Sequence, residues 1–248
     1  MKYLISELKY IVNESLVNRG EKASNIYKNI KNNGFHVIPN YISDHLITDL
    51  KEKINDYIPK RVSWVDEVKS DYRIFGIGKY QPEFDEVFHS QILKDVFDKY
   101  IDSRSMYAFT MANRVEFKEG NKGSGGGWHR DTINRRQLKF ILYLSDVNIK
   151  SGCFEYLNGS HIVTEKLKIN RLLNNSLSQY RYSDEEINKL INNYDYKKTS
   201  FIGPAGTLLI VDTSGIHRGK PIQENIRFAA TRYMSDTKFS NEMQDLLI

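Results

Sequence analysis

The hydrophobic period of the chain changes near residue 104, and this change constrains the fold more than any other feature. Before it, apolar residues recur at helical spacing; after it, short stretches of aromatic and β-branched residues alternate with tight turns. Short strands joined by tight turns are typical of a sandwich or barrel rather than of parallel βαβ units. We therefore expect a β core, with strands near residues 106–117, 137–144, 153–157, 201–202, 207–211 and 227–233.

The first hundred residues are predicted to be mainly helical. Helical patterns run over 4–31, 44–57 and 82–100, with a short apolar strand at 35–39. The segment 61–81 fits either a strand pair or a covering loop. We expect residues 1–100 to buttress a β core formed by 104–161 and 201–235.

An insertion separates the two parts of this core. No strand is predicted between Ile162 and Ser200, whereas Ser183-Asp-Glu-Glu186 is a capping box that begins a short helix. Insertions of this length between strands are often functional. Residues 162–200 are therefore predicted to form a lid.

Composition indicates one globular domain spanning 1–248. The chain is 40% hydrophobic and 27% charged, and all-β domains commonly reach this length. Charges interrupt the N-terminal residues before an apolar run forms, so neither a signal peptide nor a membrane span is expected there. The single cysteine, Cys153, excludes an internal disulfide framework. We expect a cytoplasmic protein without a membrane partner.

The net charge of +5 raises the possibility of a polyanionic partner. However, Lys and Arg alternate with Asp and Glu along most of the chain, and no run of five or six basic residues occurs. A polyanion-binding module remains one alternative, but we expect a small-molecule substrate and no nucleic acid. The oligomeric state is not specified by these patterns.

A glycine-rich loop leads into a candidate metal site. In Gly125-Gly-Gly-Trp-His129-Arg-Asp131, side chains i and i+2 of an extended segment project to the same side, so His129 and Asp131 can bind one ion. A third candidate ligand, His217, lies much later in the chain, and His161 is its competitor. Two imidazoles and one carboxylate on one face of a metal are the arrangement of non-haem Fe(II) oxygenases. A phosphate-binding reading of the glycine run is disfavoured because no Lys-Ser/Thr and helix follow it.

Several ordered motifs together resemble the phytanoyl-CoA dioxygenase-like family of Fe(II)- and 2-oxoglutarate-dependent oxygenases. The resemblance covers about residues 34–233. Asn158 stands where the family usually has proline before Gly-Ser-His, and the insertion has no counterpart in the family pattern. The matching stretches are Gly34-Phe-His-Val-Ile38, Trp128-His-Arg-Asp131, Tyr143-Leu-Ser-Asp-Val147, Gly152-Cys-Phe-Glu-Tyr-Leu-Asn-Gly-Ser-His161, Gly206-Thr-Leu-Leu-Ile-Val-Asp212, His217-Arg-Gly-Lys-Pro-Ile222 and Arg227-Phe-Ala-Ala-Thr-Arg-Tyr233.

The resemblance implies a fold and a ligand set. The fold would be a double-stranded β-helix, that is, a cupin-like jelly roll, mainly β with flanking helices. His129, Asp131 and His217 would bind Fe(II), while the Gly-Ser-His161 turn would be structural. Metal-dependent oxidation with 2-oxoglutarate and O2 as cosubstrates would hydroxylate the substrate and release succinate and CO2.

The resemblance also implies that Arg227 binds the distal carboxylate of 2-oxoglutarate. A planar guanidinium suits this role because it pairs with a carboxylate through two hydrogen bonds. Arg232 and Arg218 are rivals, although strand alternation places Arg232 on the opposite face from Arg227. Lys139 and Tyr143 share one strand face and are predicted as further cosubstrate contacts.

The substrate itself is a separate hypothesis. Arg135 and Arg136 follow Asp131 closely, and the predicted lid is net basic, so we expect a small anionic metabolite at the mouth of the barrel. The alternative is a cupin-type metal-binding protein that does not use 2-oxoglutarate and has no need of Arg227.

Overall fold

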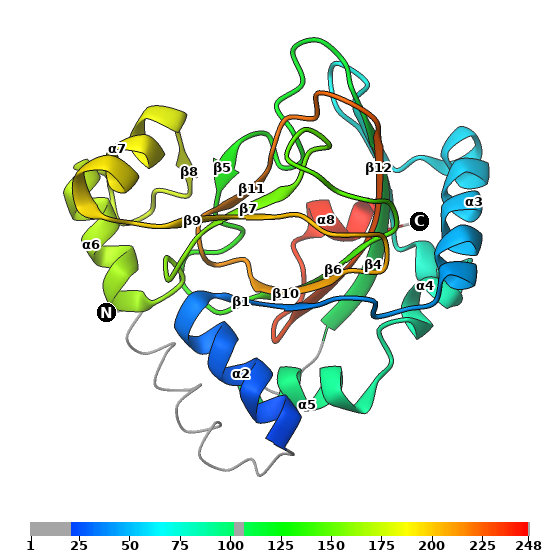
Figure 1. The fold of residues 1–248 in the computed structure, drawn as a ribbon, viewed down its shortest axis with the longest axis horizontal. Helices are drawn as coiled ribbons and strands as arrows, with labels where there is room; N and C mark the ends of the chain where they lie inside the picture. Colours follow the sequence, from blue (N-terminus) through cyan, green and yellow to red (C-terminus); the bar gives the residue numbers. More distant parts are fainter. Residues whose placement is uncertain (1–20, 102–106, 248) are drawn as a thin grey trace.

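Two antiparallel sheets face each other in the computed structural model, which describes residues 21–101 and 107–247 (Figure 1). The larger sheet has the order β1-β10-β6-β12-β4-β3-β2, and the smaller has β8-β5-β11-β7-β9. This is the predicted jelly roll. The large-sheet strands are β1 (Phe35–Ile38), β2 (Trp64–Val65), β3 (Asp71–Phe75), β4 (Tyr107–Glu116), β6 (Leu138–Tyr143), β10 (Leu208–Asp212) and β12 (Ile226–Ser235); the others are β5 (Trp128–His129), β7 (Phe154–Leu157), β8 (Arg181–Tyr182), β9 (Lys198–Phe201) and β11 (His217–Gly219).

Side-chain alternation gives the large sheet two different faces. On β6, Leu138, Phe140 and Leu142 join the core under the helices, whereas Ile141 and Tyr143 face the smaller sheet. Both sets are buried, which explains why this strand has a continuous apolar character rather than a simple alternation. Each fully buried side chain of this size contributes roughly 1.5–3 kcal/mol to stability. The space between the sheets is thus separated from the helical layer.

Helices cover the outer face of the large sheet. They are α2 (Glu21–Asn33), α3 (Asp44–Arg61), α4 (Glu83–Glu86) and α5 (Gln91–Tyr100), with a 3-10 turn at Ile77–Lys79. The single helix predicted over 82–100 is wrong, because Ser90 ends the first segment and caps α5 by accepting a hydrogen bond from the Leu93 amide at 3.3 Å. The helix predicted over 4–31 lies mostly outside the described residues. The segment 61–81 forms the strand pair β2–β3.

The insertion at 162–200 is part of the smaller sheet. Strand β8 pairs with β5, and β9 pairs with β7, so the prediction that no strand lies in this segment is wrong. Its helices, α6 (Val163–Leu173) and α7 (Asp184–Tyr194), share a buried apolar cluster with Trp128 and Leu157. Strands of two residues, such as β8, carry almost no sequence signal, which explains the omission. A lid role for this segment stays a prediction.

A short helix, α8 (Asn241–Asp245), lies beside the inner face of the large sheet. Phe239, Met243 and Leu246 pack against a cluster that includes Phe75 and Tyr233. No helix among residues 21–101 and 107–247 is long and apolar enough to cross a membrane.

Candidate active site

The three predicted metal ligands meet between the sheets. His129 on β5 and His217 on β11 are direct cross-strand partners, and Asp131 follows two residues after His129. The Nε2 atoms of His129 and His217 lie 3.6 and 3.8 Å from the Asp131 carboxylate oxygens. One ligand atom from each residue falls within 4.8 Å of the others. This donor set suits a divalent metal that keeps open positions for other ligands.

Backbone carbonyls orient both imidazoles. His129 Nδ1 lies 2.8 Å from the Gly127 oxygen, and His217 Nδ1 lies 2.9 Å from the Gly215 oxygen. A carbonyl can only accept, so each Nδ1 carries the proton and each Nε2 presents its lone pair to the site. Burial, together with the neighbouring His129, lowers the pKa of His217 to about 3. His217 is therefore neutral at physiological pH, which is the form that binds metals.

Lys139 on β6 holds the carboxylate ligand. Its Nζ lies 2.7 Å from Asp131 Oδ2 and 4.1 Å from the centre of the Tyr233 ring. Asp131 is exposed as a whole residue, but its side chain is only 18% exposed. Burial is the largest single influence and would raise the pKa of Asp131, but the charge of Lys139 and the contributions of His217 and His129 together outweigh it and hold the pKa well below its usual range. Asp131 is thus kept as an anion.

A cavity of about 560 Å³ surrounds the triad and contains Arg227. This arginine is 5% exposed and donates from Nη1 to the Gly152 oxygen and from Nη2 to Ser124 Oγ at 3.0 Å. Its Nε is buried without a hydrogen-bond partner among the described residues. A buried guanidinium with an unused donor is suited to an anionic ligand that enters the cavity.

The other predicted cosubstrate contacts also line this cavity. Lys139 and Tyr143 project from β6 beside Arg227. The Tyr143 hydroxyl donates to the Phe201 oxygen at 3.1 Å and accepts from the Phe154 amide at 3.0 Å. Burial raises the pKa of Tyr143, so the hydroxyl stays protonated. Because both of its hydrogen bonds go to the backbone, Tyr143 acts first as a link between the sheets.

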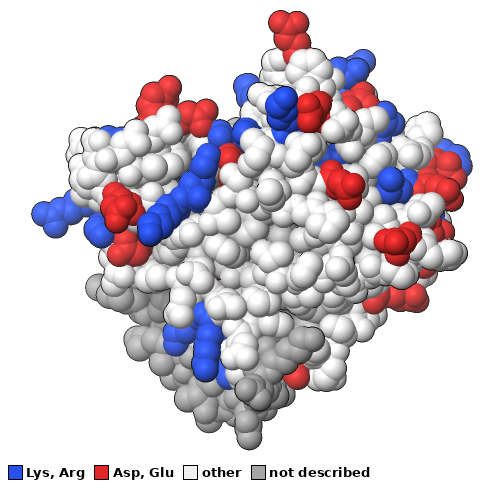
Figure 2. Space-filling model, in the orientation of Figure 1, with Lys and Arg blue, Asp and Glu red and all other residues white. Residues whose placement is uncertain are grey.

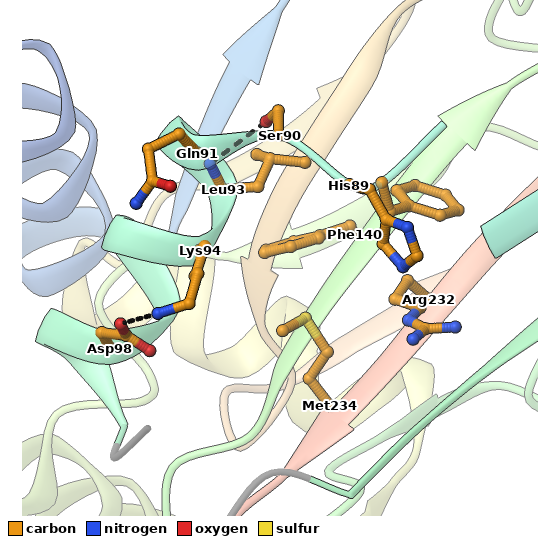
Figure 3. A pocket seen from close by; sticks show the side chains of 10 residues that line it. His89, Ser90, Gln91, Leu93, Lys94, Asp98, Phe140, Arg232 and Met234 are labelled. Carbon is orange, nitrogen blue, oxygen red and sulfur yellow. Dashed lines mark hydrogen bonds and ion pairs between the residues drawn. The ribbon is translucent and has the colours of Figure 1, made fainter. Parts of the chain in front are cut away.

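The rival arginines lie elsewhere. Arg232 is on the opposite face of β12, as alternation predicts, where it pairs with Asp85 at 2.5 Å and lines a separate cavity of about 340 Å³ (Figure 3). The residues that line this separate cavity are different from those around the triad. Arg218 binds Glu155 and Asp184 at 2.7 and 2.6 Å. Neither rival is in the triad cavity.

Arg135 and Arg136 are not brought to the site. Arg136 is 7% exposed, donates to the Tyr100 oxygen at 3.0 Å and stacks 4.6 Å from the Tyr100 ring. Neither arginine lines the triad cavity. The prediction placed both arginines by their sequence distance from Asp131, but the chain turns after Asp131 and carries Arg136 to Tyr100 at the end of α5. His161 is also remote, with Nε2 3.0 Å from the Lys31 oxygen.

Sequence reasoning missed a polar network at the edge of the cavity. Asp71 on β3 accepts from Arg73 Nη2 at 2.6 Å, from Ser124 Oγ at 2.7 Å and from Asn113 Nδ2 at 3.2 Å. Arg73, Asn113 and Ser124 line the cavity with the triad. Only the Asp-x-Arg alternation at 71–73 hinted that these side chains share one face.

An outer cavity of about 790 Å³ adjoins the inner one. Both are lined by Arg73, Phe75, Gly125, Arg181 and by Glu242 and Met243 of α8. The remaining walls of the outer cavity come from β2 and from the glycine loop at 120–126. This geometry provides room beside the metal ligands for a molecule larger than the cosubstrate.

Jelly-roll sheets with a His-x-Asp and a distal His at one mouth define a non-haem metal oxygenase site. The family model of phytanoyl-CoA dioxygenase (PhyH) matches residues 30–225, and the chain belongs to this family. The match confirms the resemblance and the iron and 2-oxoglutarate cofactor class. None of the curated proteins matches the chain.

Solved structures show the same fold at low sequence identity. The epimerase SnoN in complex with Fe3+, alpha ketoglutarate and nogalamycin RO has a TM-score of 0.65 at 12% identity, over 86% of this chain and 83% of SnoN. HygX from Streptomyces hygroscopicus, with nickel, 2-oxoglutarate and hygromycin B bound, gives 0.58 at 14%, over 87% and 88%. EctD from S. alaskensis with bound Fe gives 0.63 at 15%, over 88% and 79%.

Proposed function

We propose that this oxygenase hydroxylates a small organic molecule, with conversion of 2-oxoglutarate to succinate and CO2. His129, Asp131 and His217 would hold Fe(II), which supplies oxygen activation when bound. The observation that carries the proposal is Arg227, a buried guanidinium that lines the cavity of the triad and whose Nε has no hydrogen-bond partner among the described residues. It would bind the distal carboxylate of 2-oxoglutarate through its fork of donors.

The chain's own residues would prepare this site. Lys139 keeps the Asp131 carboxylate ionised and oriented, and the two carbonyl contacts keep both Nε2 lone pairs directed into the cavity. Phe154, Ile141 and Tyr143 form apolar walls that limit water near the triad. Such walls strengthen charge interactions inside the site.

Arg227 also separates this proposal from a metal-binding cupin that does not use 2-oxoglutarate. In such a protein, a buried arginine with an unpaired Nε would cost stability without a benefit. The polyanion alternative has no support on the face shown in Figure 2, where basic side chains are interspersed with acidic ones rather than gathered into one tract.

The substrate is proposed to occupy the outer cavity. The bound nogalamycin RO in SnoN and hygromycin B in HygX support a small-molecule substrate. We retain an anionic group on this molecule as part of the proposal, but Arg181 at the junction of the cavities, not Arg135 or Arg136, would meet it. Arg181 Nη1 already donates to the Gly125 oxygen at 3.1 Å, which fixes its position.

Two measurements test the function. Anaerobic addition of 2-oxoglutarate to the Fe(II)-loaded protein should produce a visible charge-transfer band, and an unchanged spectrum would contradict cosubstrate binding. A screen of metabolites should then identify the substrate as the compound that stimulates succinate formation. Each acidic metabolite is tested beside its neutral amide or ester. Equal stimulation by neutral and anionic partners would reject the anionic group.

A further inference from the structure

The Ser124 hydroxyl connects two charged residues on different strands. Its Oγ lies 2.7 Å from Asp71 Oδ2 and 3.0 Å from Arg227 Nη2. A carboxylate only accepts and a guanidinium only donates, so the direction of both hydrogen bonds is fixed. Ser124 donates its single proton to Asp71 and accepts from Arg227. The three residues form one hydrogen-bonded chain.

Asp71 is the fixed end of this hydrogen-bonded series. It is 3% exposed, and Arg73 donates to the same Oδ2 atom from Nε and Nη2, at 2.9 and 2.6 Å. Asn113 holds the other carboxylate oxygen at 3.2 Å. Every oxygen of the carboxylate is therefore bound to the large sheet, so the proton of Ser124 has a fixed acceptor.

The backbone around Ser124 is pressed against the smaller sheet. The Gly219 amide donates to the Ser124 oxygen at 2.9 Å, only two residues after the metal ligand His217. Gly123 has a φ of +72°, and a Cβ there would lie 2.1 Å from the Gly219 oxygen. The loop thus reaches β11 through its backbone and Arg227 through its one serine. The same loop forms a wall of the outer cavity.

We propose that Ser124 is a positioning residue that holds the Arg227 guanidinium for the cosubstrate and ties the order of the glycine loop to cosubstrate binding. The inference rests on the proposed function, because it assigns 2-oxoglutarate to Arg227. When the carboxylate fixes Arg227, the hydrogen bond from Arg227 to Ser124 becomes a further fixed attachment of the loop, in addition to those with Asp71 and Gly219. This loop, which forms a wall of the outer cavity, should therefore be more ordered once the cosubstrate is bound.

The first test is calorimetric titration of 2-oxoglutarate into the Ni(II)-loaded protein. Ser124→Ala should weaken 2-oxoglutarate binding by roughly tenfold, as expected for loss of a hydrogen bond to a charged group, and should leave Ni(II) affinity unchanged. Ser145→Ala is the matched control, because Ser145 Oγ accepts from the Phe228 amide at 3.1 Å, next to Arg227 but without touching it. This control should bind 2-oxoglutarate like the wild type.

The second test is hydrogen exchange of the amides in 120–127, with and without saturating 2-oxoglutarate. In the wild type the cosubstrate should slow exchange in this loop, and in Ser124→Ala that difference should vanish. If Ser124→Ala binds 2-oxoglutarate as tightly as the wild type, or keeps the slower exchange of the loop amides, the inference about Ser124 is wrong and the proposed function is unaffected. A wild-type protein that binds Ni(II) but no 2-oxoglutarate would instead overturn the proposed function.

Discussion

His129 and His217 lie directly opposite each other on β5 and β11, and their ring centroids are 4.4 Å apart. The two ligands are distant in sequence, so a single antiparallel pairing sets their separation. A shift of register by one residue would send one ring to the other face of the sheet. The geometry of the predicted metal site is therefore specified by strand pairing as much as by the identity of the predicted ligands.

Removal of any triad residue should sharply weaken iron binding without unfolding the protein. His129→Ala, Asp131→Ala and His217→Ala each delete one of three ligands, and we expect iron affinity to fall by more than about a hundredfold, beyond the effect of losing an outer contact. Iron stoichiometry after anaerobic loading measures this. The control is His161→Ala, which should keep full stoichiometry because its ring binds the Lys31 carbonyl. Unchanged iron in His217→Ala would place the third ligand elsewhere.

Arg227 should control the requirement for 2-oxoglutarate rather than for iron. Arg227→Ala removes the guanidinium from the cavity, and we expect roughly a hundredfold weaker 2-oxoglutarate binding, in line with loss of a hydrogen-bonded charge pair. Arg227→Lys should recover only part of the affinity because an ammonium lacks the planar fork. Arg232→Ala, on the other face of the same strand, serves as the control in a titration of the Ni(II) protein. Normal affinity in Arg227→Ala would reject the assignment.

Gly125 should be required for the position of His129. It has a φ of +89°, and a Cβ there would lie 2.2 Å from His129 Cε1. Gly127 has a φ of +95° with open space around its Cβ position, so it is a matched control for backbone strain. Both alanine variants should lose on the order of 1–2 kcal/mol of stability from the left-handed backbone. Only Gly125→Ala should also lose iron affinity. Iron titrations that give the same affinity for the two variants would contradict this prediction.

Asp71 should make the protein sensitive to acid. Burial would raise the pKa of Asp71, but the Arg73 charge and the hydrogen bonds from Arg73, Ser124 and Asn113 together lower it below 3.8. A carboxyl with a lowered folded-state pKa stabilises the fold fully above its unfolded pKa and loses this contribution as pH falls through the folded value. The difference in unfolding free energy between wild type and Asp71→Asn should thus be constant above about pH 5 and shrink below about pH 4.

Denaturant titrations at several pH values measure this difference. The control is Asp56→Asn on α3, an exposed side chain whose replacement should leave the unfolding curve unchanged at every pH. A difference between wild type and Asp71→Asn that grows on acidification would contradict the assigned direction of the pKa shift.

Most strands and the shared side of His129 and Asp131 were predictable because their signals are local. Strand alternation placed Arg227 toward the cavity and Arg232 away from it, and the His-x-Asp spacing alone put two ligands on one side. The buried run 138–143 was recognisable from its composition. These features depend on neighbouring residues, which a single sequence displays.

The missed features depend on pairings between distant segments. Nothing around Ser124 shows that its hydroxyl meets Asp71, because the contact forms only when β3, β4 and β12 assemble. The prediction that Arg136 lies near the metal ligands was wrong for the same reason. Its nearness to Asp131 in the sequence does not reveal the turn that places it under Tyr100. Strand β8 has only two residues, too few to be distinguished from the loops around it, and Lys198, Thr199 and Ser200 of β9 show no apolar pattern.

The short helix α8 belongs to neither sheet, yet Glu242 and Met243 line both cavities. The triad and Arg227, by contrast, are fixed by strand pairings on the far side of the same space. We therefore expect α8 to border the proposed substrate, while strand pairings hold the predicted metal ligands and Arg227. If the substrate occupies the outer cavity as proposed, substitutions of Glu242 or Met243 should change which molecules bind there and leave the alignment of the triad unchanged.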